Sequence, residues 1–164
     1  NVISITDGQI FLESNLFNSG QRPAVNVGLS VSRVGGAAQT KATKKAAGSL
    51  RVDLAQYREM EVFTQFASDL DDATKEQLRY GKGLMELLKQ PLGKPLSMAG
   101  QVLTLWTATH KIFLDVEPEK IKATQAKMLE FFAVEHPEII NELNETKVMS
   151  DELYSSEKST SSER

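Results

Sequence analysis

The sequence predicts a mainly α-helical fold in which a few β-strands precede an α-helical bundle. Before Gly36, β-branched and small residues favour short extended runs separated by loops. From Gly36 onward, apolar residues recur at the spacing of one helix face, and capping residues, glycine and proline interrupt them. We therefore expect strands in residues 1–36, a helical bundle in residues 37–149 and a tail in residues 150–164.

The first stretch, residues 2–13, predicts a β-hairpin or a strand, a turn and a second strand. Val2, Ile3 and Ile5 favour a strand, and Ile10, Phe11 and Leu12 resume the apolar run. Asp7-Gly8 lies between them and tolerates the positive φ of a tight turn. A polar loop at residues 18–23 follows.

The next stretch, residues 23–33, predicts a stiff strand that ends at Arg33, just before Gly35-Gly36. A guanidinium is always charged, and its rigid fork of donors matches phosphate oxygens. A surface salt bridge would satisfy Arg33 equally well. The spacing alone therefore leaves both roles open.

Two helical regions are expected between residues 37 and 90. Gly48 predicts a bend in the first, and the acids at residues 69–72 suit the start of the second. The first has its apolar stripe at Leu50, Leu54, Tyr57, Met60, Phe63 and Ala67, and the second at Leu78, Met85 and Leu88. The second should stop at Gln90, before Pro91.

Three further helices are expected. Ser97 caps the first, Glu117-Pro118 begins the second, and His136-Pro137 separates it from a short last helix. Their apolar sides are, in order, Val102, Leu105, Trp106, Ile112 and Phe113; Ile121, Met128, Leu129 and Phe132; and Ile139, Ile140 and Leu143. Trp106 and His110 are interpreted as core and surface residues, and Tyr154 to Arg164 as a disordered tail.

Composition excludes several classes of protein. The 164 residues contain no cysteine, which excludes disulfides and Cys-ligated zinc, and no apolar run reaches the ~20 residues of a spanning helix. With two histidines and no nucleophile motif, a Ser-His-Asp site is not expected, nor is a metal site. Because the chain starts at Asn1, we expect an excised or processed piece.

A signature resembles a known family. Pro23-Ala-Val-Asn26, followed by Ser30 and Ser32, resembles the signature shared by the nucleotide-binding subunits of rotary ATP synthases. The run from Asn26 to Gln39 is similar to the α subunit of F-type enzymes in particular. Further similar stretches, all in one order up to about residue 116, are residues 1–12, 54–57, 65–71 and 87–90.

The resemblance implies that the strands complete the nucleotide-binding α/β domain of a full-length subunit. In that family α is the regulatory subunit and alternates with β subunits in a hetero-hexamer, with a central stalk γ and a peripheral stalk δ. ATP synthesis or hydrolysis in β is coupled to proton transport. ATP or ADP with Mg²⁺ is expected in the full-length subunit. None is expected in this fragment, which lacks the Gly-x-x-x-x-Gly-Lys-Ser/Thr loop and should be inactive alone.

The resemblance also implies roles for single residues. Arg33 would reach the neighbouring β-subunit catalytic site as an arginine finger, with Ser4 and Ser30 as weaker candidates near the same site. Their hydroxyls would serve equally well to satisfy local backbone groups. Gln90 would contact adenine, although the family commonly carries a second glutamine where this chain has Leu92.

The expected location is a peripheral membrane complex on the cytoplasmic face of a bacterial plasma membrane, or the equivalent mitochondrial matrix or plastid stroma face. The chain would reach the membrane only through that complex. A competing hypothesis is a helical module that only docks on partner subunits. A nucleic-acid-binding bundle would use Lys41, Lys44 and Lys45, but the net charge of −3 and the small cluster argue against nucleic acid.

Overall fold

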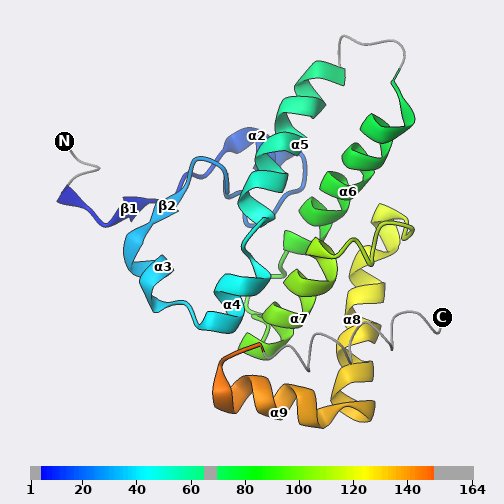
Figure 1. The fold of residues 1–164 in the computed structure, drawn as a ribbon. Coiled ribbons are helices and arrows are strands. Elements are labelled where there is room, and N and C mark those ends of the chain that lie inside the picture. The colour runs from blue at the N-terminus through cyan, green and yellow to red at the C-terminus, as the bar shows by residue number, and fades with distance from the viewer. Residues whose placement is uncertain (1–4, 65–69, 150–164) are drawn as a thin grey trace.

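The computed structural model describes residues 5–64 and 70–149. Helices form a bundle, and the N-terminal residues form an arm that extends from one side of it (Figure 1). The predicted fold class, mainly helical with a few strands at the N-terminus, is confirmed. Ser4, Ala67, Asp69 and the predicted tail 150–164 lie outside the described residues.

The arm contains a short antiparallel sheet. β1 (Gly8–Gln9) pairs with β2 (Val31–Ser32), with Gly8 opposite Ser32, and an isolated bridge joins Leu12 to Val25. α2 (Ser14–Asn18) lies in the connection. The predicted turn at Asp7-Gly8 is therefore wrong, because Gly8 lies in a strand that pairs with a segment more than 20 residues away.

Three helices follow β2: α3 (Arg33–Ala38), α4 (Lys41–Ala46) and α5 (Leu50–Thr64). The Ser32 hydroxyl accepts the Gly35 amide at 2.9 Å, which starts α3 at Arg33. Arg33 thus ends the predicted strand and begins a helix. Gly48 lies in the turn between α4 and α5, as predicted.

The bundle continues with α6 (Asp72–Leu88), α7 (Met98–Thr109), α8 (Pro118–Glu135) and α9 (Pro137–Thr146). Asp71 and Ser97 cap α6 and α7, and proline opens α8 and α9. These starts agree with the predictions. α6 ends at Leu88 rather than Gln90, and α7 ends at Thr109, so Ile112 and Phe113 lie in the turns that follow.

Two clusters form the core. The first joins α4, α7, α8 and α9 and includes Ala42, Ala46, Val102, Leu103, Trp106, Phe132, Leu143 and Met149. The second joins α5, α6, the end of α7 and α8 and includes Leu50, Leu54, Leu84, Leu87, Phe113 and Ile121.

The buried face of α6 is rotated from the predicted one. Leu84 and Leu87 are buried, whereas Leu78, Met85 and Leu88 are only partly buried. Glycines make this possible: a Cβ at Gly81 would meet the Tyr57 ring, and one at Gly83 would lie 3.2 Å from Ile121 Cδ1. Phe63, predicted as part of the α5 stripe, is 77% exposed.

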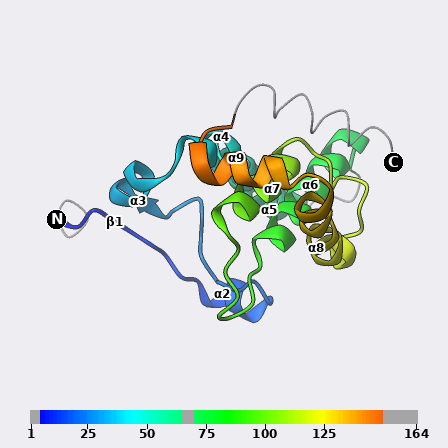
Figure 2. The ribbon, with the colours of Figure 1, turned by 90° about the horizontal axis from the view of Figure 1, so that it is seen from below.

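Polar contacts join the arm to the bundle. Arg51 Nη2 donates to the Gly28 carbonyl at 2.9 Å, and the backbone amide of Gln90 donates to the Arg22 carbonyl at 2.8 Å. Figure 2 shows the loop between α6 and α7 running beside α2. The arm is therefore anchored at more than one point along its length.

Candidate functional site

Arg33 lies at the junction of β2 and α3. Its backbone amide donates to the Asp7 carbonyl at 2.9 Å, and its Nη2 lies 3.5 Å from the Thr6 carbonyl oxygen. The side chain is exposed, and no carboxylate of the described residues lies within ion-pair distance of it. The backbone at Arg33 is thus held by Asp7, the residue before β1, while most of the guanidinium donors have no partner among the described residues.

Ser30 is bonded to its own arm. Its hydroxyl donates to the Asn26 carbonyl at 2.6 Å and accepts the Phe11 amide at 3.0 Å. The bond from Phe11 ties the segment before β2 to the stretch that follows β1. The described hydrogen bonds of the Ser30 hydroxyl are therefore both to backbone groups of the arm itself.

Asn26 organises this region, a role that sequence reasoning did not assign. It is 3% exposed; its Nδ2 donates to the Glu13 carboxylate, and its Oδ1 accepts the Leu29 amide at 3.0 Å. Its backbone amide also donates to the Phe11 carbonyl at 2.8 Å. The sequence signal that could have indicated this role was the place of Asn26 in the Pro-Ala-Val-Asn run. An amide side chain that is buried in such a run requires hydrogen-bond partners.

Gln90 lies at a different place. It is exposed in the loop after α6, and its backbone amide donates to the Arg22 carbonyl. The Arg22 guanidinium lies over the Phe17 ring, 4.4 Å from the ring centre. Leu92, two residues on, is fully exposed. No hydrogen bond or ion pair of the described residues joins Gln90 to Ser30 or Arg33. The predicted site residues that the structure describes thus lie in two separate places, Ser30 and Arg33 in the arm and Gln90 in the loop after α6.

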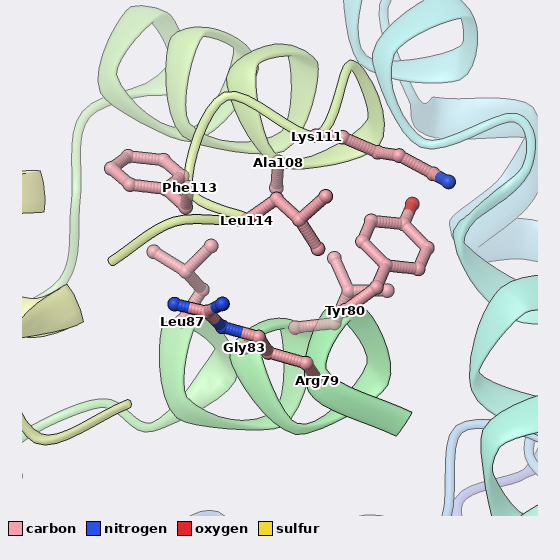
Figure 3. A pocket seen from close by; sticks show the side chains of 9 residues that line it. Arg79, Tyr80, Gly83, Leu87, Ala108, Lys111, Phe113 and Leu114 are labelled. Carbon is pink, nitrogen blue, oxygen red and sulfur yellow. The ribbon is translucent and has the colours of Figure 1, made fainter. Parts of the chain in front are cut away.

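A small depression lies between α6 and the turn after α7 (Figure 3). Tyr80 and Lys111 lie at its edge. Lys111 Nζ is 2.9 Å from Glu76 Oε1, and the Tyr80 hydroxyl donates to Asp53 Oδ2 at 2.9 Å. The depression leaves about 10 Å³ for the centre of a water molecule. Ligand pockets measure roughly 300 Å³ or more, so it does not fit a nucleotide.

His110 packs on a core residue. His110 stacks on Trp106 with ring centres 4.2 Å apart, and its Nδ1 lies 2.8 Å from the Trp106 carbonyl oxygen. Trp106 is buried and His110 is exposed, as predicted. Within residues 5–64 and 70–149, no three His, Cys, Asp or Glu side chains are grouped to hold a metal ion. In the same ranges, no helix has the length and apolar character needed to cross a membrane.

Residues 39–163 match the family described as "ATP synthase alpha/beta chain, C terminal domain". The chain belongs to the ATP synthase alpha/beta family. Residues 1–32 match a second description of the family, "ATP synthase alpha/beta family, nucleotide-binding domain". The two matches divide close to α3, where the arm gives way to the helical bundle.

Curated relatives show which subunit of the ATP synthase alpha/beta family this chain is similar to. ATP synthase subunit alpha from Proteus mirabilis (strain HI4320) and from Yersinia pestis (strain Pestoides F) are each 56% identical over 153 residues, which is 93% of this chain. The chain spans 30% of the length of each relative. The resemblance to the C-terminal portion of the alpha subunit is confirmed, and the relatives are bacterial.

Proposed function

We propose that this chain acts as the C-terminal part of the alpha subunit of a proton-translocating ATP synthase and supplies Arg33 to the catalytic site of a neighbouring beta subunit. The observation that carries this proposal is an exposed guanidinium that has no carboxylate partner among the described residues, on a backbone held by the Asp7 carbonyl next to β1. A group that acts in a partner's site must be both accessible and held at a fixed position.

The chemistry of phosphoryl transfer favours such a group. Phosphoryl transfer spreads negative charge over the γ-phosphate oxygens, and a guanidinium entering a water-poor cleft offsets that charge. The bidentate fork of arginine suits two phosphate oxygens at once. Because the group comes from another subunit, catalysis would depend on the geometry of the interface, and rotation would change turnover by moving that interface.

The described part of the chain does not fit a complete nucleotide site. It has no phosphate-binding glycine loop, and the depression beside Tyr80 is too small. We therefore place the reacting nucleotide in the beta subunit, and ATP or ADP with Mg²⁺ of the alpha subunit itself in the preceding part of a full-length chain. Gln90 would then contact adenine from its exposed loop, and Ser30 and Ser4 would support the Arg33 strand.

The same proposal covers domains, partners and location. Residues 1–36 would complete the nucleotide-binding domain, and residues 37–149 would form the separate helical domain. Beta subunits would alternate with alpha in a hetero-hexamer, the gamma and delta subunits would contact it, and the complex would lie on the cytoplasmic face of a bacterial plasma membrane. The bacterial relatives support this location over an organelle.

The test places Arg33→Lys in the full-length alpha subunit within the assembled complex. We expect assembly to persist and cooperative ATP turnover to fall strongly, because lysine keeps the charge and loses the fork. In small GTPases an arginine finger contributes about 10³ to 10⁵ in rate, which sets the upper range. Arg79→Lys, an exposed position on α6 outside the arm, is the matched control and should leave turnover near normal.

The second candidate is a helical module that only docks on partner subunits. The exposure of Val62 at 59% and Phe63 at 77% near the end of α5 favours it, since such side chains suit a partner surface. A pure docking role predicts near-normal turnover of the Arg33→Lys complex, and this result would exclude the finger.

A further inference from the structure

The last described residues of the chain pack against α4. Met149 is 4% exposed and packs in the first core cluster with Ala42 and Ala46. The Ala42 amide donates to the Lys147 carbonyl at 3.0 Å, and Lys45 Nζ lies 3.5 Å from the Met149 carbonyl oxygen. The described part of the chain therefore ends beside this helix.

α4 presents a lysine face at this point. Lys41, Lys44 and Lys45 are all exposed and lie at i, i+3 and i+4, so that their ammonium groups share one side of the helix. Lys41 and Lys44 form no ion pair with any carboxylate of the described residues. Three neighbouring cations repel one another and attract an anionic segment.

The segment that follows has the complementary charge. Residues 150–157 read Ser-Asp-Glu-Leu-Tyr-Ser-Ser-Glu and contain three acids and no basic residue. Asp151 and Glu152 follow Met149 at two and three residues, a span of at most about 7 to 11 Å of extended chain. They are therefore within reach of the lysine face without any change in the bundle.

We propose that the lysine face of α4 is the docking surface for the chain's own acidic segment, residues 150–157, with Asp151 and Glu152 as its main contacts. Opposite charge and the short tether favour this occupant over an acidic partner from solution, which would have to bind without the tether's high effective concentration. The contact holds the end of α9 and Met149 against α4. Because it is an exposed charge contact, salt weakens it.

The test measures amide hydrogen exchange of residues 150–157 in the full chain. At low salt, about 0.05 M, we expect protection that falls about three- to tenfold at about 0.5 M. Lys41→Glu/Lys44→Glu should cause a similar loss at low salt, and adding Asp151→Lys/Glu152→Lys should restore protection. Lys94→Glu/Lys127→Glu makes the same change of charge at exposed positions on other elements and should leave the segment unchanged.

Three results would overturn the proposal: exchange that no lysine variant changes, reversed charges that fail to restore protection, or protection that disappears on dilution and so comes from a second copy. Far-ultraviolet circular dichroism checks that each variant is folded. If the charge-reversed pair does not fold, Lys41→Gln/Lys44→Gln removes the same two charges and should reduce protection in the same direction.

Discussion

Gly81 on α6 lies so close to Tyr57 on α5 that a Cβ at residue 81 would stand 2.3 Å from ring carbons. This contact explains why a glycine occupies the interior of a helix, where it ordinarily costs about 1 kcal/mol relative to alanine. The absent side chain lets the aromatic ring pack on the α6 backbone. The approach of α5 and α6 depends on this pair.

Gly81→Ala should therefore destabilise the bundle even though alanine is the better helix former. We expect a loss of about 1–3 kcal/mol in the free energy of unfolding, because the ring must leave its position. Urea unfolding measures it. Gly36→Ala, in helix α3, is the control and should not destabilise, because the new Cβ would meet nothing within 4 Å beyond its chain neighbours and its own helix backbone. Equal effects of the two substitutions would show that packing on Tyr57 is unimportant.

A buried polar pair joins α7 to α8. Gln125 Nε2 donates to Thr104 Oγ1 at 3.0 Å, and both residues are 4% exposed. Thr104→Val leaves the Gln125 donor without this acceptor, which should cost about 1–3 kcal/mol of stability. Thr124→Val, whose hydroxyl bonds to the Lys120 carbonyl of its own helix, should cost less.

The coupling of this pair is measured with a double variant. Thr104→Val/Gln125→Met removes both partners, so its loss of stability should be smaller than the sum of the two single losses. Urea unfolding of the three variants gives the difference. Strict additivity would mean that the hydrogen bond contributes nothing specific.

The two tyrosines between α5 and α6 predict loss of stability at high pH. Burial raises the pKa of Tyr57 to about 12, with smaller contributions from the charge of Glu61 and from the hydrogen bond to Glu61. Burial also raises the pKa of Tyr80, together with the hydrogen bond to Asp53. A raised folded-state pKa means that the unfolded chain releases the proton first. The stabilisation is complete below about pH 10 and is lost as pH rises through the folded-state pKa.

We therefore expect the free energy of unfolding to fall between about pH 10 and pH 12, and to fall less in Tyr57→Phe/Tyr80→Phe. Urea unfolding across this range tests it, and tyrosinate absorbance follows ionisation directly. The matched measurement below about pH 9 separates ionisation from packing, since both phenols are then protonated in either state. An identical pH slope in the two proteins would contradict the assignment.

Local signals were predictable from the sequence. Ser97, Gly48 and Pro118 each act within one helical turn, so the residue type alone fixes a cap, a break or a start. The buried face of α6 was not predictable from its large apolar residues. It is set by Gly81 and Gly83, whose contribution is an absent side chain that only a neighbouring helix reveals.

The candidate site shows the same division. The role proposed for Arg33 comes from the family resemblance, because a single arginine after a strand is compatible with many roles. Its surroundings depend on the pairing of β1 with β2 across more than 20 residues, which local pattern does not contain. Local pattern predicted that Gly8 lies in a turn, whereas the structure needs a glycine there because a Cβ would collide with Val31 on the opposite strand.

Gly8 offers the final prediction, which links the arm to the proposed role of Arg33. Its φ is +144°, and a Cβ would lie 1.9 Å from the Val31 carbonyl oxygen. Gly8→Ala should separate β1 from β2 and release the Arg33 amide from Asp7, while the bundle, whose core lies elsewhere, keeps its stability. Hydrogen exchange should therefore accelerate at residues 31–33 with the urea midpoint unchanged.

Gly28→Ala is the matched control, because a Cβ at residue 28 would lie at an ordinary contact distance of 3.5 Å from Asn26 Oδ1. In the assembled complex Gly8→Ala should also lower ATP turnover, since the guanidinium would keep its charge and lose its fixed position. Loss of turnover with an intact bundle would separate positioning of Arg33 from folding. Unchanged exchange at residues 31–33 would show instead that the β1–β2 pairing does not hold Arg33 in place.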